Sequence, residues 1–229
     1  RAFLFNHIKI LSEFYDIYLV AYFENSNQDD FKKFPLKSLK NIQIQRKIRL
    51  FKDIKALISL TKYFRKMNFD AIHTITPKAG LLGSLGGRLA KIKNRIHIFT
   101  GQVWHTKRGV LKKILMIFDR FIAFNMTHIL VDGKSQRQFL IENKIISKSN
   151  SHILGKGSIS GVDDKRFSID ESVRLKIRNE LKINSDELVY MFLGRMNQDK
   201  GIYELVEAFS LLKEKYKNIR LLLVGYDEE

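Results

Sequence analysis

Cysteine is absent from the chain. Its absence excludes a disulfide scaffold, a thiolate metal site and a thiol nucleophile, and it fits a reducing compartment. No apolar run in the sequence reaches the length that a membrane-spanning helix needs. The N-terminal stretch RAFLFNHIKILSEFYDIYLV has neither a starting methionine nor the cleavage pattern of a signal peptide. We therefore expect these residues to be a piece of a longer chain.

Acidic residues are scarce compared with basic ones. The chain has 41 Lys and Arg against 24 Asp and Glu, which gives a net charge of +17. Between Phe31 and Lys66 there are twelve Lys and Arg and a single acid, Asp53. Such a charge favours an anionic partner, whether nucleic acid, lipid headgroups or a phosphorylated substrate, and an ordinary solvated face is the alternative. The apolar fraction of 45% indicates a globular protein.

Short apolar runs alternate with longer helical patterns along the chain. This alternation predicts an α/β fold with parallel sheets, in two doubly wound, Rossmann-like domains that face a cleft, both truncated here. We place the first domain at 1–156 and the start of the second at 157–229. The predicted strands are 16–23, 42–45 (weak), 69–75, 95–100, 127–132, 151–155, 188–194 and 219–225. The predicted helices are 51–66, 77 to about 91, 110–125, 135–143 and 202–216.

Two of the predicted helices, 51–66 and 110–125, combine an apolar stripe with Lys and Arg. Helices of this kind lie on anionic membrane surfaces, or they turn the stripe to the core and the charges to solvent. The basic segment before helix 51–66 favours the membrane for that helix. The stripe predicted to form one face of helix 51–66 consists of Phe51, Ile54, Leu57, Ile58, Thr61 and Phe64.

The stretch IHTITPKAG joins a predicted strand to a predicted helix. Thr76 is expected to cap that helix and Pro77 to occupy its first turn. Ligands of open α/β sheets bind beyond the carboxyl ends of the strands, near helix N-termini. His73, Thr74 and Lys78 therefore become candidates for a ligand-binding cleft, although a hydrogen-bonded histidine at a strand end is equally compatible with the pattern.

The loop FTGQVWHTKRG follows another predicted strand and holds the only tryptophan of the chain. Polar and aromatic loops in this position often bind substrate. We assign Thr100, Gly101, Gln102 and Trp104 to the same cleft. His105 is a candidate general base, and a surface histidine is the simpler interpretation.

The glycine-rich segment GKGSISG, 155–161, follows a strand but matches a dinucleotide-binding motif poorly, because its last glycine falls one place late and no helix follows. We interpret Gly157, Ser158 and Gly161 as an interdomain loop that lines the cleft. The adjacent acids at 29–30 and 163–164 have no further ligand at metal-binding spacing, so no metal site is predicted. Asp163 is expected to cap a turn beside Arg166 and Phe167.

The stretch FLGRMNQDKG ends a buried strand at Gly194 and leads into a helix through Lys200. Arg195 and Lys200 thus stand beside free backbone amides near a helix start. Arginine binds phosphate oxygens with a planar fork and lysine acts as a point charge, so the pattern predicts a diphosphate site. Two surface cations on a loop are the alternative.

FLGRMNQDKGIYELVEAF resembles the Gly-Arg…Lys-Gly…Glu-Ala-Phe signature of the retaining GT-B glycosyltransferases of family 4. GSISGVDDKRF is similar to their Gly-Val-Asp-x-x-Arg-Phe segment. IHTITPKAGLLGSLGGRLA and VDGKSQ look like the branch that builds bacterial capsule and O-antigen. The resemblance covers essentially the whole chain and is specific for the family, not for a sugar.

This resemblance implies that Gly194, Arg195 and Lys200 bind the diphosphate of a nucleotide-diphospho-sugar, for which UDP is favoured. It also implies transfer with retention of configuration, without a metal or other cofactor, to a lipid-linked glycan acceptor at the inner face of the cytoplasmic membrane. The domain at 1–156 would then hold the acceptor in the predicted cleft, and the domain from 157 would hold the nucleotide-sugar. The basic N-terminal domain would also attract anionic lipid. No nucleic acid is expected as a partner.

The chain departs from the family pattern at three places. The first strand with its glycine-rich turn and the later paired-glutamate motif are missing, and the C-terminal DEE is not that motif. Many members carry a histidine where this chain has Thr100 or Gly101, so the catalytic residue stays unassigned and we expect the fragment alone to be inactive. The alternatives are a catalytically silent partner that binds sugar nucleotides and, less favoured because the aromatic residues fall on apolar faces, a nucleic-acid-binding protein.

Overall fold

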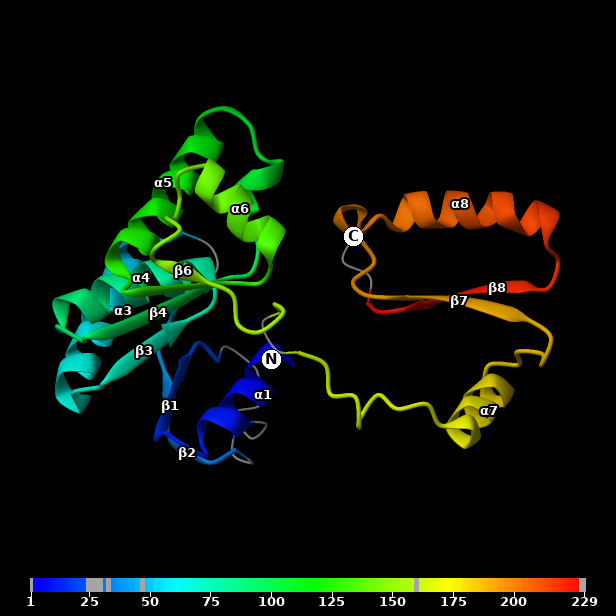
Figure 1. Cartoon of the computed structure of the whole chain (residues 1–229), viewed down its shortest axis with the longest axis horizontal. Helices are drawn as coiled ribbons and strands as arrows, with labels where there is room; N and C mark the ends of the chain where they lie inside the picture. The colour runs from blue at the N-terminus through cyan, green and yellow to red at the C-terminus, as the bar shows by residue number, and fades with distance from the viewer. Residues whose placement is uncertain (1, 24–30, 32–33, 46–47, 159–160, 227–229) are drawn as a thin grey trace. The chain divides into compact units, whose positions relative to one another are not determined.

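The computed structural model describes residues 2–23, 31, 34–45, 48–158 and 161–226. The pair Asp29–Asp30, residues 159–160 of the glycine-rich loop and the C-terminal DEE lie outside this set. The chain divides into two compact units, Arg1–Val162 and Asp163–Glu229, each built from helices and parallel strands (Figure 1). The sequence-based division lay a few residues earlier, after Lys156.

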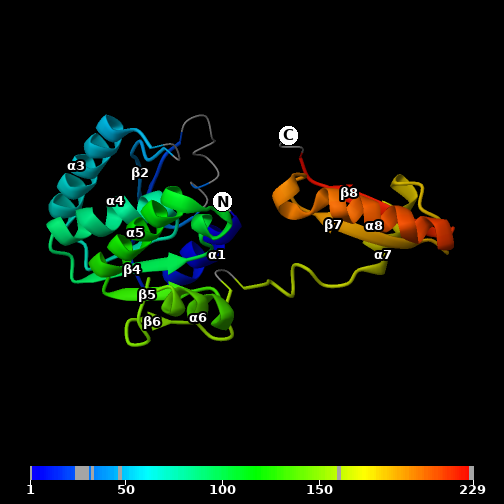
Figure 2. The same ribbon diagram turned by 90° about the horizontal axis from the view of Figure 1, so that it is seen from above.

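The first unit contains two parallel sheets. Strands β1 and β2 pair in one sheet, and the other has the order β3-β4-β5-β6, with every pair parallel. Helices α4 and α5 pack on this larger sheet and α3 packs on α4 (Figure 2). The elements in chain order are α1 (Ala2–Leu11), β1 (Ile17–Ala21), β2 (Leu36–Asn41), α3 (Leu50–Met67), β3 (Ala71–Thr74), α4 (Pro77–Leu89), β4 (Asn94–Phe99), η1 (Val103–Thr106), α5 (Gly109–Asn125), β5 (His128–Val131), α6 (Lys134–Glu142) and β6 (Ser151–His152).

Two clusters of buried apolar residues form the core of this unit. One joins α5, α6, β4 and β5 and includes Trp104, Ile122, Ile129 and Leu140, each at most 1% exposed. The other joins α3, α4 and β3 around Leu60, Phe64, Ile72 and Leu82. Burying a side chain of this size contributes about 1.5–3 kcal/mol, so these clusters hold the sheet and its helices together.

The second unit is a βαβ arrangement preceded by a helix. Its elements are α7 (Glu171–Glu180), β7 (Leu188–Leu193), η2 (Gln198–Lys200), α8 (Ile202–Lys215) and β8 (Ile219–Val224). Strands β7 and β8 pair in parallel and in register along their whole length, from Leu188 opposite Ile219 to Leu193 opposite Val224. Their carboxyl ends therefore finish at the same level.

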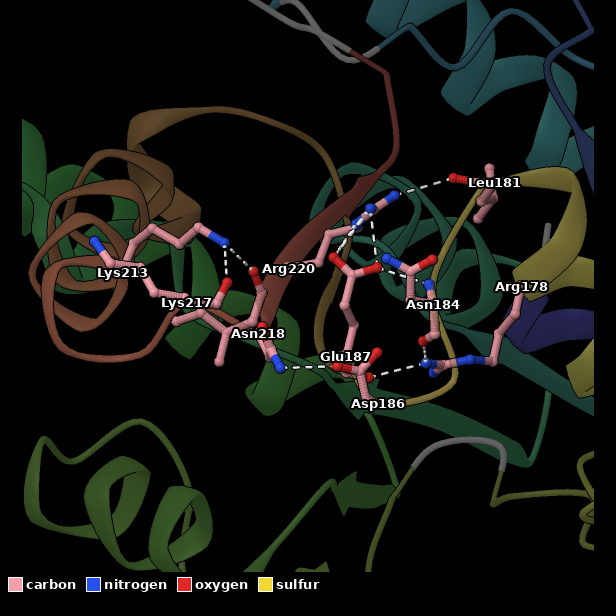
Figure 3. A network of polar contacts seen from close by, with 10 residues as sticks. Arg178, Leu181, Asn184, Asp186, Glu187, Lys213, Lys217, Asn218 and Arg220 are labelled. Atoms are coloured by element: carbon pink, nitrogen blue, oxygen red, sulfur yellow. Dashed lines mark hydrogen bonds and ion pairs between the residues drawn. The ribbon is translucent and has the colours of Figure 1, made fainter.

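A polar network joins the amino ends of β7 and β8 (Figure 3). The guanidinium of Arg220 donates to both carboxylate oxygens of Glu187 at 3.0 Å. The N–H of Asn184 donates to the same carboxylate at 2.7 Å. Lys213 donates to the carbonyls of Lys217 and Ile219 at 2.6 and 2.8 Å. The network fixes the register at this end of the sheet and leaves the opposite end to the candidate site.

The α/β class with parallel sheets is confirmed, and so is the cap of α4, since Thr76 accepts from the Ala79 N–H and Pro77 occupies the first turn. The strand predicted at 42–45 is wrong. The strand is β2, one segment earlier, and residues 42–45 have no regular structure. Ile42 is buried and Ile44 half-buried against the α3 cluster, so their apolar character reflects packing rather than a strand.

The predicted apolar face of α3 is wrong in part. Thr61 and Phe64 are buried as expected, but Phe51, Ile54 and Ile58 are 84%, 47% and 49% exposed. The buried stripe instead runs through Ala56 and Leu60, about one residue around the helix. Helices α1 and α7 were not predicted at all, because their sequences lie next to a strand and in a polar segment respectively.

Candidate functional site

The first of two separate candidate sites lies where β7 and β8 of the second unit end side by side. Gly194 follows β7 and its N–H donates to the carbonyl of Val224 at 3.0 Å. A Cβ atom placed on Gly225, directly after β8, would lie only 1.7 Å from the carbonyl oxygen of Gly194. A Cβ atom on Gly194 would lie 3.2 Å from the Phe192 ring. The end of β8 therefore needs glycine at position 225, whereas a Cβ atom on Gly194 would require only a small shift of the Phe192 ring.

Arg195 and Lys200 flank the loop that leads from these strand ends to α8. Arg195 follows Gly194 and is exposed, and Lys200 is the last, exposed residue of η2. Gly201 then takes a left-handed conformation with φ of 71° and ends the 3-10 turn immediately before α8. A residue with a Cβ atom is strained in this conformation, so the sharp entry into α8 depends on Gly201.

This arrangement supplies the elements of an anion site. The first N–H groups of an α-helix have no partner within the helix, and the helix dipole adds partial positive charge at this end. A diphosphate placed there would also meet the two cations of the loop. An anion with several oxygens would suit these groups. The sequence predicts the same kind of ligand for Gly194, Arg195 and Lys200.

The other candidate site lies at the carboxyl edge of the four-stranded sheet in the first unit. Thr74 ends β3, and its hydroxyl is 2.8 Å from Nδ1 of His97 on the neighbouring strand. His97 is 1% exposed, while His73 is exposed and stacks on His7 with ring centroids 6.0 Å apart. Desolvation by the neighbouring atoms, followed by the charge of His7, lowers the pKa of His73 to about 4. Solvent weakens this effect, because the residue as a whole is exposed.

Burial lowers the pKa of His97 to about 3. The unfolded chain therefore binds a proton below about pH 6.5 that the folded chain does not, and stability falls as pH drops from 6.5 towards 3. We expect the wild type to lose up to about 1.4 kcal/mol per pH unit in this window relative to His97→Gln. Urea unfolding at pH 7 and at pH 5 gives the change of unfolding free energy with pH for each of the two proteins. The same change in both would contradict the lowered pKa of His97. Asp119, with its pKa raised to about 6, acts in the opposite direction below pH 6 in both proteins.

Lys78 does not stand alone at this edge. Its ammonium lies 2.7 Å from a carboxylate oxygen of Asp53 on α3, and the two side chains are only 14% and 16% exposed. The other carboxylate oxygen of Asp53 accepts from the Arg49 N–H at 3.1 Å. The ion pair ties the start of α4 to the start of α3, so Asp53 neutralises the charge that Lys78 would bring to a ligand.

Trp104 is a core residue in this structure. It is 1% exposed, donates from Nε1 to Asp119 at 2.7 Å and stacks on Phe139 at 5.1 Å. Burial raises the pKa of Asp119 to about 6, against the lowering effect of the Trp104 N–H. His105 is exposed and meets Phe139 edge to face at 5.3 Å. The tryptophan thereby fixes the loop after β4 to the hydrophobic core and does not line an open surface.

Thr100, Gly101 and Gln102 begin that loop, directly beyond the carboxyl end of β4. Thr100 and Gly101 are exposed, and a Cβ atom on Gly101 would meet nothing within 4 Å. Gln102 is half-buried and its Oε1 accepts from Nε2 of Gln136 on α6 at 3.2 Å. Three of the predicted cleft residues thus lie together at one edge of the sheet.

The glycine-rich loop reaches the same edge. Gly157 has φ of 107°, and a Cβ atom on it would lie 2.4 Å from the carbonyl oxygen of Asp132, directly after β5. The Ser158 N–H donates to this carbonyl at 2.7 Å. Gly161 also has positive φ but open space around it. Further on, Asp163 accepts from the Arg166 N–H at 3.0 Å, as expected for a turn cap.

Several residues with a clear place in the site were not singled out in the sequence. Gly225 follows a strand, as Gly194 does, but carries no charged neighbour that marks a ligand. Asp53, Asp119 and Asp132 are single acids whose partners are distant in sequence. Among the described residues no group of three or more His, Cys, Asp or Glu is placed to hold a metal ion. No helix in the described ranges is long and apolar enough to cross a bilayer.

The second unit matches the model of a known protein family. The profile of the family "Glycosyl transferases group 1" matches residues 173–229, which include both strand ends and both cations. Residues 173–229 of the second unit are therefore similar to the group 1 glycosyltransferases.

Curated relatives extend the similarity across both units. The chain is 27% identical over 211 residues to the capsular polysaccharide biosynthesis glycosyltransferase CapM of Staphylococcus aureus, covering 92% of this chain and 54% of CapM. It is 26% identical over 170 residues to an Escherichia coli UDP-Gal:alpha-D-GlcNAc-diphosphoundecaprenol alpha-1,3-galactosyltransferase, covering 74% of this chain and 43% of that protein. The chain thus spans about half the length of these relatives.

Solved structures share the fold at low identity. Anabaena HepE, solved in complex with UDP-glucose, superposes with a TM-score of 0.75 at 13% identity, covering 98% of this chain and 56% of HepE. A glycosyltransferase from Rickettsia africae gives a TM-score of 0.66 at 17% identity, covering 98% of this chain and 55% of that one. The fold class predicted from the sequence, GT-B, is confirmed.

Proposed function

We propose that the protein transfers a sugar from a nucleotide-diphospho-sugar to a lipid-linked or glycan acceptor in the synthesis of a bacterial surface polysaccharide. The observation that carries the proposal is the paired strand ends at Gly194 and Gly225, followed by Arg195, Lys200 and the start of α8. The names of the relatives supply the substrate classes: HepE was solved with UDP-glucose, and the Escherichia coli relative uses a UDP-galactose donor and a diphosphoundecaprenol acceptor.

In the proposed reaction the bond between C1 of the sugar and the nucleotide diphosphate breaks, and a new bond forms from C1 to an acceptor oxygen. The acceptor hydroxyl proton passes to the departing diphosphate. Negative charge grows on that diphosphate in the transition state, where Arg195, Lys200 and the backbone amides are already in place to stabilise it. These fixed positive groups replace the role that a metal ion plays in other transferases, so chelators should leave transfer unchanged.

Retention of configuration at C1 is part of the proposal and rests on the family resemblance. Proton NMR of the first-formed product distinguishes an α-linked from a β-linked sugar and thereby tests it. Thr100 and Gly101 occupy the place of a histidine found in many family members, which keeps a silent sugar-nucleotide-binding partner as the second candidate. Transfer by the full-length protein would exclude that candidate.

We further propose that the first unit binds the cytoplasmic face of an anionic membrane. Helix α5 exposes an apolar stripe at heptad-like spacing, and α3 exposes Phe51 and Ile54 beside lysines. Apolar stripes flanked by cations insert into the headgroup region. The exposed members of the α5 stripe are Val110, Ile114, Ile117, Phe121 and Phe124.

Calorimetric titration of the full-length protein with UDP, GDP and ADP tests the donor class. We expect UDP to bind and the other two to bind at least about tenfold more weakly, a difference of about 1.4 kcal/mol. Folded protein that binds none of the three would refute the proposed function.

Flotation of the same preparation with phosphatidylglycerol and with phosphatidylcholine vesicles tests the proposed binding to a membrane. Binding to neither kind of vesicle would refute that proposal.

A further inference from the structure

Two side chains at the carboxyl edge of the four-stranded sheet have polar atoms that the fold does not satisfy. Oδ1 of Asp132 and Nε2 of Gln102 are both buried, and neither has a hydrogen-bond partner among the residues that the structure describes. Leaving such a group unpaired carries its full desolvation penalty with no hydrogen bond in return. Unpaired buried groups are rare in folded proteins and call for a physical reason.

The topology places these two residues at the same edge of the sheet. Phe99 of β4 pairs with Val131 of β5, so the chain segments that follow both strands leave the sheet at the same level. Gln102 is held towards α6 by its bond from Gln136, and Asp132 lies two residues before α6 begins. The Ser158 N–H fixes the backbone of Asp132 from the other side.

Both residues remain open to a ligand. Each is only half-buried as a whole, although the unpaired atom itself is covered. The terminal torsions of Asp and Gln are broad and roughly two-fold, so a rotation presents the carboxylate or the amide to solvent without moving the backbone. Burial also raises the pKa of Asp132, in keeping with a carboxylate that has lost water and gained no partner.

The chemistry of the pair selects its ligand. A carboxylate accepts hydrogen bonds and an amide NH2 donates them. A metal cation would suit the carboxylate but offers no acceptor to the amide hydrogens, and a phosphate would suit the amide but would be repelled by the carboxylate. A hydroxyl group both donates and accepts, and two neighbouring hydroxyls of a sugar ring can engage both side chains at once.

We propose that Asp132 and Gln102 form a subsite for the hydroxyl groups of the acceptor sugar, with Asp132 accepting from one hydroxyl and Gln102 donating to its neighbour. This inference rests on the proposed function and adds a specificity element to it. It places a neutral sugar ring, not the diphosphate of the acceptor, against the loop after β4. The subsite lies wholly in the first unit.

The test uses full-length protein and saturation-transfer-difference NMR with the methyl glycosides of glucose, galactose and N-acetylglucosamine as probes. We expect at least one glycoside to give a signal with the wild type, and the signal to fall at least about fivefold in Asp132→Asn and in Gln102→Leu. Pyrophosphate should not displace the glycoside. The matched control is Asp70→Asn, the same change at an exposed acid beside the amino end of β3.

Native-state hydrogen exchange of the β4 and β5 amides adds a readout of the first unit that separates binding from structure. A carboxylate kept for a ligand leaves stability unchanged or improved when it is replaced, because its desolvation cost disappears. We therefore expect these amides to exchange no faster in Asp132→Asn than in the wild type, while the variant loses the glycoside.

No signal from any glycoside, unchanged signals in both variants, or faster exchange of the β4 and β5 amides in Asp132→Asn would each overturn the subsite. Binding of UDP by the same samples distinguishes this failure from a failure of the proposed function. Protein that binds UDP but no glycoside would sink the subsite alone, whereas protein that binds neither would sink both.

Discussion

Arg195→Ala combined with Lys200→Ala is expected to abolish nucleotide binding and transfer while the protein stays folded. In the proposed site each cation would make charge-assisted hydrogen bonds to the diphosphate, worth about 1.5–3 kcal/mol. Losing both should weaken UDP binding by a factor on the order of 100 to 10,000. Both side chains are exposed, so their removal leaves no cavity. Calorimetry with UDP and a transfer assay measure the two losses, and circular dichroism checks the fold.

A control is needed because the protein carries a net charge of +17, and any loss of positive charge weakens its attraction to anions. Arg174→Ala combined with Lys217→Ala makes the same change of charge within the same unit. Arg174 lies on α7 and Lys217 just before β8, away from the carboxyl ends of the strands. If this control loses as much UDP affinity as the site variant, the effect is general electrostatics and the diphosphate assignment fails.

The fold class could be predicted from the sequence because it depends on local patterns. The apolar run before Gly194 and the capped start at Thr76 and Pro77 each contain their own signal. Residues 42–45 were misassigned because a short alternating apolar run looks the same whether it pairs as a strand or only packs against α3. The buried face of α3 was predicted wrongly because some of its apolar residues are exposed and lie in the same turns as its basic residues. The sequence pattern therefore does not separate a buried face from an exposed one.

The candidate site was predictable only where chemistry and chain order coincide. Arg195 and Lys200 follow a strand and precede a helix within one short stretch, so the sequence alone brings them together. The pairing of Lys78 with Asp53, of Trp104 with Asp119 and the proximity of Asp132 to Gly157 join residues far apart in the chain. Such contacts appear only when the strands are placed side by side, since no periodicity in one segment reports the neighbour of another.

Gly225→Ala is expected to disrupt the end of the sheet on which the diphosphate site is built. The new Cβ atom would lie 1.7 Å from the Gly194 carbonyl oxygen and 2.8 Å from its carbonyl carbon. Both are backbone atoms, so relief requires the strands to separate. Separation would break the bonds from Gly194 to Val224 and from Met196 to Tyr226, both 3.0 Å long. Overpacking costs about 1–3 kcal/mol and each lost hydrogen bond about 1 kcal/mol, which together give roughly 3–5 kcal/mol.

Because the chain divides into two units, a single melting temperature would mix their stabilities. Native-state hydrogen exchange of the β7 and β8 amides reports on the second unit alone, and a loss of about 3 kcal/mol corresponds to exchange roughly 100-fold faster. Gly133→Ala is the control, since a Cβ atom there meets nothing within 4 Å and its φ of -165° suits any residue. The fall in UDP affinity should accompany the faster exchange, because the site depends on the two main chains lying in contact. Wild-type exchange rates in Gly225→Ala would mean that the strand ends do not meet at these glycines. The proposed diphosphate site would then lack its structural basis.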